Sequence, residues 1–342
     1  MATSTKLNFS ALLHIPQLPT YLAQVEQGLA GALAHATPSL HKPIKRLIND
    51  QSKRLRPALV IAAAAARGVA IDKKVIAGCV AVELVHIGSL VHDDIIDNAV
   101  TRWGVSTVNG KEGVHRALLV GDYLFASANA QAATISAEVA RTIAAAIAGV
   151  CNGEAQELAD QYNPDRTVQA MLQAIDGKTA TLIAAACQVG GLCSSLTNAH
   201  VAALAHFGHE FGMAFQLIDD VLDVVSTPQL MGKAVGNDMQ EGVYTMPLLL
   251  SLQGPSGPKL KKMLADRATP AAAFAKILVA DGSIAKTIAA AQAYNRSAAQ
   301  ALGKCGDTKT AAALCALPDV YLRWAIKNLV ADAYASGVHQ HA

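Results

Sequence analysis

Residues 90–97 read Leu-Val-His-Asp-Asp-Ile-Ile-Asp, and residues 216–223 read Gln-Leu-Ile-Asp-Asp-Val-Leu-Asp. Each stretch carries the pattern D-D-x-x-D among leucine, isoleucine and valine. In an α-helix, residues four positions apart share one face, so the first and last aspartates of each copy lie one turn apart. Like charges at this spacing destabilise a helix, which indicates that both clusters bind something positive. The six aspartates are Asp93, Asp94, Asp97, Asp219, Asp220 and Asp223.

The chemistry of the two clusters favours a hard metal ion. A lone D-D-x-x-D pattern is equally consistent with an acidic surface turn, but two copies inside apolar helices favour metal binding. Oxygen ligands without cysteine or histidine select Mg²⁺, which binds one or two carboxylates together with substrate phosphates. We expect His92 to pack beside the first cluster or to support a ligand, because imidazole is a poor partner for Mg²⁺. The pattern therefore predicts Mg²⁺ ions that bridge to a diphosphate.

The composition and the spacing of apolar residues predict an all-α fold. Of the 342 residues, 52% are hydrophobic and only 4% are aromatic, so the apolar residues are mostly alanine, leucine, isoleucine and valine. Alanine runs favour helices, and apolar residues recur at three- and four-residue spacing. We find no convincing strand. The main predicted helices are Val75–Asp97, Arg116–Ala133, Ala137–Asp160, Thr167–Cys187, Ala199–Val225 and Pro318–Ala335.

The chain is predicted to form one large helical domain over residues 1–342. No change of composition marks a linker between domains, and most predicted loops are short. Residues 1–20 are expected to form a loose N-terminal segment and residues 336–342 a flexible tail. The stretch Ser226–Pro247 is the exception among the loops, because it is long, polar and rich in glycine. Such a loop in a compact bundle is typically functional or disordered.

Charge, hydropathy and cysteine usage exclude several classes of protein. Lys and Arg total 28 against 26 Asp and Glu, for a net charge of +2, so we expect no binding to nucleic acid. No apolar stretch reaches the roughly 18 residues that a transmembrane helix needs, and residues 1–20 lack the layout of a signal peptide. The six cysteines form no C-x-x-C pair and lie mostly in apolar helical patterns. We therefore expect a cytoplasmic, reduced protein with no transmembrane segment.

Isolated cations accompany the two acidic clusters. Lys53 and Arg54 begin a predicted helix, and either an anion site or a basic surface turn is consistent with them. His86 lies two turns before Asp93 on the same helix face, where a buried core histidine is the alternative to a ligand. Five further polar residues lie near the clusters, and each is also consistent with an ordinary solvated side chain. They are Arg102, Lys178, Thr179, Gln216 and Lys233.

Taken together and in order, these motifs resemble those of the trans-polyprenyl diphosphate synthases. The resemblance covers residues 45–250 and, more loosely, the whole chain. Each fragment is weak evidence alone, but their number and order make a strong signal. The matching fragments are KRLRP (Lys53–Pro57), ELVH (Glu83–His86), LVHDDIIDNA (Leu90–Ala99), VGDYLF (Val120–Phe125), GKTA (Gly177–Ala180), FQLIDDVLD (Phe215–Asp223), GKAVGND (Gly232–Asp238) and TMPLLL (Thr245–Leu250).

The resemblance implies a fold, an activity and roles for the site residues. The implied fold is an isoprenoid-synthase-like helical bundle around a deep central cavity, commonly a homodimer. The implied activity condenses an allylic prenyl diphosphate with isopentenyl diphosphate and releases diphosphate. The six aspartates would bind Mg²⁺ and, through it, the allylic diphosphate, with Asp93, Asp97, Asp219 and Lys178 taking part in catalysis. Lys53, Arg54 and His86 would hold isopentenyl diphosphate, and Arg102, Lys178, Thr179, Gln216 and Lys233 would contact the allylic substrate.

Three departures from the family pattern concern binding of the co-substrate. Trp103 follows Arg102 where a second arginine is usual, and Val243 stands where the later G-K-x-T motif has lysine. Gln51-Ser52 precedes Lys53 where a glycine is common. One lost charge-assisted contact to phosphate is worth ~1.5–3 kcal/mol, so weaker or altered substrate binding is expected.

Two small residues predict a long product. Gly88 and Ser89 lie about one turn before Asp93, where they would face the growing prenyl chain. Short-chain members of the family often carry an aromatic residue there, so small side chains predict an open tunnel and a product longer than fifteen carbons. Two other functions fit the motifs. One is a terpene cyclase on the same fold, and the other is a regulatory subunit of a hetero-oligomeric synthase.

Overall fold

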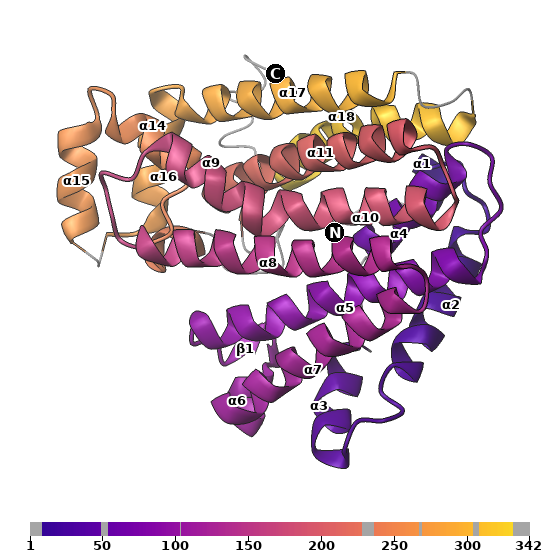
Figure 1. Ribbon diagram of the computed structural model, residues 1–342. Coiled ribbons are helices and arrows are strands. Elements are labelled where there is room, and N and C mark those ends of the chain that lie inside the picture. The colour runs from indigo at the N-terminus through magenta and orange to yellow at the C-terminus, as the bar shows by residue number, and fades with distance from the viewer. Residues whose placement is uncertain are drawn as a thin grey trace.

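The computed structural model describes residues 9–48, 54–102, 104–227, 236–266, 269–303 and 308–330. Almost all of the described chain is helical, which confirms the all-α prediction (Figure 1). The elements up to the first acidic cluster and the long helices after it are α1 (Phe9–Leu12), α2 (Leu18–Gly31), α3 (Pro38–Ile48), α4 (Leu55–Ala65), α5 (Lys73–Ile96), β1 (Thr101–Arg102), β2 (Val105–Ser106), α6 (Val108–Glu112), α7 (Val114–Ala133) and α8 (Ala137–Ala159).

The second half of the chain continues as helices of varied length. A single π-helical turn, η1, interrupts the series between α9 and α10. The elements are α9 (Val168–Ile175), η1 (Asp176–Ala180), α10 (Thr181–Cys193), α11 (Asn198–Val225), α13 (Asn237–Gln240), α14 (Met246–Leu252), α15 (Gly257–Ala265), α16 (Ala271–Ala280), α17 (Ser283–Leu302) and α18 (Lys309–Leu329).

The long predicted helices are confirmed within a few residues, with three corrections. The predicted helix Thr167–Cys187 is three elements, because the π-helical turn η1 separates α9 from α10. Pro318 does not start the last helix but lies inside α18, which begins at Lys309. A short antiparallel hairpin, β1–β2, follows the first acidic cluster and pairs Thr101 with Ser106. Strands of two residues are too short to produce a detectable alternation.

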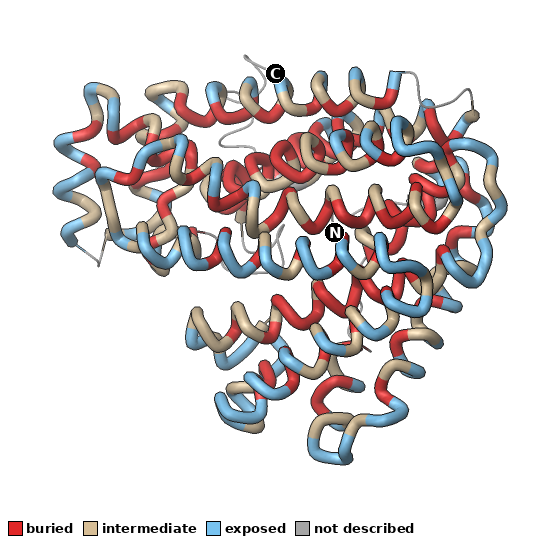
Figure 2. Tube along the Cα trace, in the orientation of Figure 1, coloured by how far each residue is buried: buried red, intermediate tan, exposed pale blue. Residues whose placement is uncertain are grey.

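The helices pack around α10, which contacts α4, α5, α8 and α11. On one side α5 packs against α7, and on the other α11 packs against α17 and α18 (Figure 1). Burial is concentrated along α4, α5, α10 and α11, at the centre of the bundle (Figure 2). The acidic clusters of α5 and α11 therefore belong to helices that the core itself holds in place.

A close contact of α10 with α4 depends on glycine. A Cβ on Gly190 would lie 2.3 Å from the backbone oxygen of Val60 and 2.8 Å from the Cβ of Ala63. Real Cβ atoms do not approach a backbone oxygen so closely, so only glycine fits where these helices cross. This contact sets how far α10 can approach α4 and, through α10, how α5 and α11 are placed.

The described part of the N-terminal segment is packed, which corrects the expectation of a loose segment there. Leu13, Ile15 and Leu18 are all buried in the core. The segment therefore contributes apolar area to the bundle from Leu13 onwards. The predicted C-terminal tail, residues 336–342, lies outside the described residues.

Helix α5 is longer and more apolar than the sequence analysis allowed. By length and composition alone it could cross a membrane, so the prediction that no stretch is apolar enough is wrong. However, 72% of its most apolar window is buried inside the protein. Its low polarity is explained by its position, because helices that are apolar on all sides occur in the cores of large bundles as well as in membranes.

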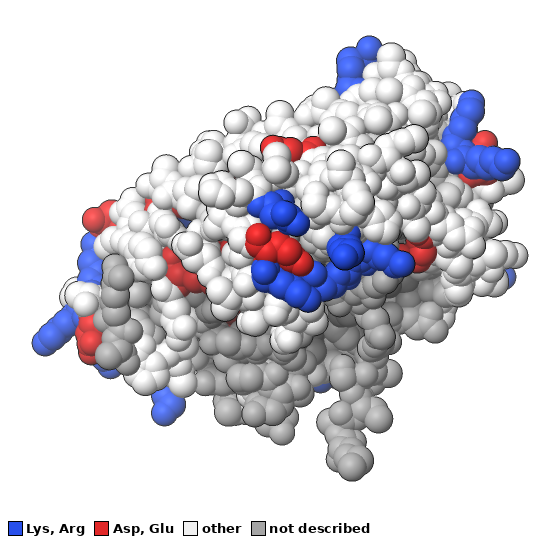
Figure 3. Space-filling view, turned by 90° about the horizontal axis from the view of Figure 1, so that it is seen from below, with Lys and Arg blue, Asp and Glu red and all other residues white. Residues whose placement is uncertain are grey.

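Seen from below, the face in Figure 3 carries charged side chains in small mixed groups rather than in one basic area. One described pair near α3 and α6 is Arg46 with Glu112, whose Nη1 and Oε1 atoms are 2.8 Å apart. Opposite charges that pair in this way partly cancel each other's field at the surface.

We predict that Gly190→Ala destabilises the protein by about 1–3 kcal/mol, because the added methyl group overpacks the contact between α10 and α4. Urea denaturation followed by circular dichroism measures the change. Gly31→Ala is the matched control, because nothing lies within 4 Å of a Cβ at this helical position. Its effect should stay below about 1 kcal/mol. Equal stability of the two variants would contradict the proposed packing.

Candidate active site

Both acidic clusters lie at the C-terminal ends of their helices. Asp97 caps α5, and its N–H donates to the carbonyl of Asp93 at 2.8 Å. The second cluster occupies the last two turns of α11, which ends at Val225. The C-terminal end of a helix carries a partial negative charge from the aligned peptide dipoles. Carboxylates and helix dipoles therefore act together to make this region attractive to cations.

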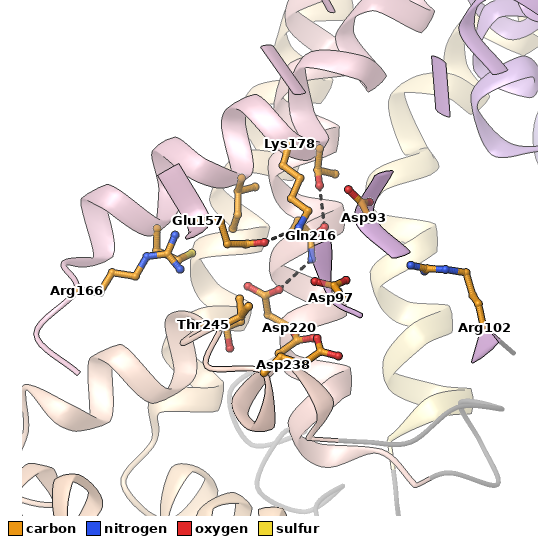
Figure 4. Close-up of a pocket in the computed structure, with 15 residues that line it drawn as sticks. Asp93, Asp97, Arg102, Glu157, Arg166, Lys178, Gln216, Asp220, Asp238 and Thr245 are labelled. Atoms are coloured by element: carbon orange, nitrogen blue, oxygen red, sulfur yellow. Dashed lines mark hydrogen bonds and ion pairs between the residues drawn. The ribbon is translucent and has the colours of Figure 1, made fainter. Parts of the chain in front are cut away.

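A cavity of about 200 Å³ opens between the two helix ends. Asp93 and Asp97 reach it from α5, and Gln216 and Asp220 reach it from α11 (Figure 4). Its lining is strongly polar, with carboxylates more numerous than cations. The described lining residues are Asp93, Asp97, Arg102, Glu157, Arg166, Met171, Ile175, Lys178, Thr179, Gln216, Asp220, Asp238, Glu241, Val243 and Thr245.

Lys178 enters the cavity from the π-helical turn η1. Its Nζ forms ion pairs with Glu154, at 2.7 Å, and with Glu157, and these carboxylates together with Asp93 hold the pKa of Lys178 above its usual value against the opposing effect of burial. The turn packs against α8 without room for a side chain, because a Cβ on Gly177 would lie 2.7 Å from the carbonyl oxygen of Gly149. A π-turn in a helix frequently occurs at a functional site. Here the turn places the Lys178 ammonium near the aspartates.

A chain of hydrogen bonds joins η1 to α11. Thr179 Oγ1 donates to Gln216 Oε1 at 2.9 Å, and Gln216 Nε2 donates to Asp220 Oδ1 at 3.0 Å. This orients Asp220 and leaves its other oxygen, Oδ2, buried with no hydrogen-bond partner within the described part of the chain. A buried carboxylate oxygen without a partner is costly, so the position fits a ligand that supplies positive charge.

A bound cation would stabilise the ionised aspartates of the cavity. Burial raises the pKa of Asp93 to about 7, although Lys178 and Arg102 oppose the shift. Burial and the neighbouring Asp238 raise the pKa of Asp220 well above its usual value. These raised pKa values mean that the ionised forms of the two carboxylates are destabilised in the cavity. Oxygen donors of this kind suit Mg²⁺, and the residues present therefore fit the metal that the sequence predicts.

The other three predicted aspartates are not part of the cavity lining. Asp94 accepts a hydrogen bond from Arg102 Nε at 2.7 Å, and Asp219 accepts one from the hydroxyl of Tyr321 at 3.0 Å. The side chain of Asp223 is buried, and its carbonyl oxygen accepts from the N–H of Gly236 at 2.8 Å. In the described parts of the chain, no three side chains of His, Cys, Asp or Glu are grouped closely enough to hold a metal alone.

Arg54, which is predicted to bind substrate, joins several helices through its side chain. Its side chain is 6% exposed and donates to Glu26 Oε1 at 2.6 Å, to Glu83 Oε1 at 2.8 Å and to the carbonyl of Ile48 at 2.6 Å. Its backbone has a φ of 46°, in the left-handed region that side chains rarely adopt. These bonds join α2, α3 and α5, and they leave little of the guanidinium for a substrate.

Arg56 is the residue of this motif that the sequence analysis missed. It is half-buried near Glu83, Asp93 and Asp219, and its Nε is buried with no hydrogen-bond partner among the described residues. Burial lowers the pKa of Arg56, and the three carboxylates oppose that shift. His86 belongs to the same region, and its pKa is well below its usual value because of burial and then of Arg56. His86 is therefore a neutral imidazole near a guanidinium.

Several other predictions are resolved by position. Arg102, Lys178, Thr179 and Gln216 line the cavity as expected of substrate-contacting residues. Lys53, Trp103 and Lys233 lie outside the described residues. Residues that the sequence analysis did not select also line the cavity or hold its lysine. They are Glu154, Glu157, Arg166, Asp238 and Glu241. Their only sequence signal was proximity to the named motifs.

The chain-length prediction concerns Gly88 and Ser89. A Cβ on Gly88 would lie 2.9 Å from the ring of Phe125 on α7, so an aromatic side chain packs beside this position. Ser89 donates from its hydroxyl to the carbonyl of His86 at 2.9 Å. Neither residue lines the described cavity. The role of these two residues in setting chain length stays a prediction.

Comparisons with known proteins agree with the fold and the motifs. The family model "Polyprenyl synthetase" matches residues 37–280. The chain is 38% identical over 233 residues to heptaprenyl diphosphate synthase component 2 of Geobacillus stearothermophilus, covering 68% of this chain and 72% of that protein. It is 32% identical over 245 residues to nonaprenyl diphosphate synthase of Mycobacterium tuberculosis, covering 71% and 73%. The solved heptaprenyl diphosphate synthase of Staphylococcus aureus superposes with a TM-score of 0.82 at 30% identity, covering 93% of this chain and 99% of that one.

We predict that Arg54→Met costs about 3–5 kcal/mol of stability, because it leaves the buried carboxylate of Glu83 without its partner. Arg46→Met is the matched control, since it breaks a more exposed ion pair with Glu112 and should cost about 1 kcal/mol or less. Chemical denaturation of both variants gives the comparison. A stable Arg54→Met protein with weakened substrate binding would instead restore the substrate-contact role.

Proposed function

The chain belongs to the polyprenyl synthetase family, and on that premise we propose that it is a trans-polyprenyl diphosphate synthase. The proposed reaction joins an allylic prenyl diphosphate to isopentenyl diphosphate, releases diphosphate and gives a medium- or long-chain product. The printed names of its relatives, heptaprenyl and nonaprenyl diphosphate synthase, support that product class. Residues 1–342 would act as one helical domain.

The observation that carries the proposal is the meeting of two acidic helix ends across one cavity. Asp93 and Asp97 of α5 line the same cavity as Asp220 of α11, with Lys178 between the clusters (Figure 4). Carboxylates that repel one another in this way suit a ligand that brings both metal charge and phosphate oxygens. An allylic diphosphate with Mg²⁺ is such a ligand.

Asp93, Asp97 and Asp220 would hold the metal, with the other motif aspartates Asp94, Asp219 and Asp223 close behind them. Bound Mg²⁺ would neutralise the diphosphate oxygens and make the diphosphate a better leaving group. The buried Oδ2 of Asp220, which has no hydrogen-bond partner in the described structure, supports this assignment. So does the raised pKa of Asp93, because a metal would relieve the cost of its buried charge.

The protein's own residues would bind, orient and shield the reacting groups. Lys178, fixed by Glu154 and Glu157, would stabilise negative charge as the allylic C–O bond breaks. Arg102, Thr179 and Gln216 would contact the allylic diphosphate. The alkene of isopentenyl diphosphate then attacks the allylic carbon, and a proton passes to the released diphosphate. Apolar wall residues of the cavity, such as Met171 and Ile175, would exclude water from the cation.

Isopentenyl diphosphate would bind beside this cavity, near Arg56 and His86. Arg56 replaces Arg54 in this assignment, since Arg54 is committed to Glu26 and Glu83. The half-buried side chain of Arg56 lies near Asp93 and Asp219, which would place the second substrate next to the first. Lys53, from the same motif, remains part of the proposal.

We place the enzyme in the cytoplasm, without a membrane span. The helix that passes the length and composition test, α5, is mostly buried within the bundle. It carries the first acidic cluster into the cavity, so its burial and its function both depend on the folded bundle. The five described cysteines are free in this structure, in keeping with a reduced compartment.

We predict that the purified chain condenses isopentenyl diphosphate with allylic primers of ten, fifteen or twenty carbons, and that EDTA abolishes turnover. Asp93→Asn should lower kcat/KM by about a hundredfold or more, because it removes a carboxylate from the metal site. Asp165→Asn is the control, since its side chain is 76% exposed and pairs with Lys261 away from the cavity. Radiolabelled isopentenyl diphosphate and mass analysis of the products measure turnover and chain length.

The outcomes of this assay separate the alternatives. Hydrocarbon released from an allylic diphosphate alone would favour a terpene cyclase. No turnover by the isolated chain, with activity restored by a second subunit, would favour a component of a hetero-oligomer, as the name of the Geobacillus relative suggests. A product of fifteen carbons or fewer would overturn the proposed chain length.

We also propose that the chain forms a homodimer through α7. Val114, Leu118 and Leu119 are exposed apolar residues on this helix, at 53%, 49% and 56%. Val114 and Leu118 lie one turn apart on one side of the helix, and Leu119 lies about 100° around the axis from Leu118. Exposed apolar residues clustered along one helix in this way are typical of subunit contacts. The helix also packs on α5, so a dimer contact here would support the helix that carries the first acidic cluster.

We expect light scattering after size-exclusion chromatography to give the mass of two chains. Leu119→Glu should shift the protein toward the monomer, because it places a charge within the apolar contact. Glu138→Gln, an exposed change at the start of α8, should leave the mass unchanged. A monomeric wild-type protein at micromolar concentration would contradict the dimer.

A further inference from the structure

Arg166 is a buried arginine that lines the cavity and belongs to none of the sequence motifs. It lies in the connection between α8 and α9, where its N–H donates to the carbonyl of Asn163 at 3.2 Å. Its side chain is only 1% exposed. Figure 4 places it across the carboxylates from Arg102. The cavity therefore has a second arginine on its opposite wall.

The protein does not satisfy the guanidinium of Arg166. Nη1 donates to the carbonyl of Tyr244 at a long 3.4 Å, and Nε lies 3.5 Å from Asp160 Oδ2. Neither Nε nor Nη2 has a hydrogen-bond partner among the described residues. An arginine carries five N–H donors in a fixed plane, and a buried charge with unmade hydrogen bonds is unfavourable. The geometry of the Arg166 guanidinium is therefore suited to binding an anion.

The other cavity cations are already engaged. Lys178 is held by two glutamates, and Arg102 is paired with Asp94 and 31% exposed. Arg166 is more deeply buried than either and less well paired. A planar guanidinium of this kind can contact two phosphate oxygens through two parallel N–H donors in a fixed fork, whereas a lysine acts as a compact point charge.

Val243 is an apolar residue of the cavity that Arg166 also lines. It directly precedes Tyr244, whose carbonyl accepts the hydrogen bond from Arg166. The resemblance described above places a lysine at this position, and here an isopropyl group takes its place. The same cavity therefore lacks a cation at residue 243 and has one at Arg166, on a different element.

We propose that Arg166 binds the diphosphate group of the allylic substrate and supplies the positive charge that Val243 does not. This inference rests on the proposed function, because it assumes that the cavity receives a diphosphate. A purely structural role, in which Arg166 only ties the α8–α9 connection to Tyr244, is the competing explanation. The two differ in what a new cation at residue 243 should do.

The test uses the purified full-length chain and inorganic diphosphate with Mg²⁺, with binding followed by titration calorimetry. Arg166→Met should weaken binding by about tenfold or more, in line with the loss of a charge-assisted contact. Adding Val243→Lys to this variant should recover a large part of the affinity. Arg141→Met, an exposed arginine on α8, should bind as the wild type does.

Arg166→Lys keeps the charge and most of the volume, so it provides the test if the methionine variant does not fold. We expect it to bind diphosphate several-fold more weakly, because a point charge replaces a planar pair of donors. Wild-type affinity in Arg166→Lys and, where it folds, in Arg166→Met would overturn the inference. So would a double variant in which Val243→Lys recovers nothing.

Parallel kinetics separate this inference from the proposed function. If the wild-type chain condenses the two substrates and the Arg166 variants keep the KM for the allylic diphosphate, the inference alone fails. If the wild-type chain forms no product but its diphosphate affinity depends on Arg166, the proposed function fails and the anion site stands. A raised KM with nearly unchanged kcat would support binding of the allylic diphosphate in the ground state.

Discussion

The repulsion between buried carboxylates at the ends of α5 and α11 is the constraint on which the rest of the structure depends. Asp93, Asp97 and Asp220 share one cavity, and burial raises the pKa of each of them. Two helix C-termini add to the negative potential. The core tolerates this arrangement because α10 packs on both helices and α4 packs on α5 and on α10. Packing energy from the apolar core thus stabilises a site that is unfavourable until its ligands bind.

The positive groups of the cavity are held by different means, and this explains their different roles. Lys178 is placed by a π-turn that packs without a side chain at Gly177 and is then fixed by two glutamates. Arg54 is satisfied on all sides and joins three helices. Arg56 and Arg166 each carry buried donors that the described protein does not satisfy. Residues of the same chemical type are thus divided into those that hold the fold and those that are available to anions.

The helices could be predicted from the sequence because apolar residues at three- and four-residue spacing report directly on a buried helix face. The pairing of the two acidic clusters could be inferred because their cost in an apolar helix demands a ligand. The distinction between Arg54 and Arg56 could not, because it depends on which side of α4 faces Glu26 and Glu83. The π-turn at Asp176–Ala180 and the role of Phe125 beside Gly88 also depend on contacts between helices distant in the sequence. Local sequence patterns do not predict such contacts.

The nearly continuous apolar surface of α5 has a consequence for biogenesis. The ribosome releases residues 73–96 before the chain that forms α7, α8 and α10 has been made, and these are among the helices that cover α5. For that interval the nascent polypeptide exposes a segment whose length and hydropathy match those of a bilayer-spanning helix. Such segments are prone to aggregate or to be captured by other apolar surfaces. Production of this protein therefore depends on chaperone protection or on rapid docking of later helices, and slow translation beyond residue 96 would lower its yield.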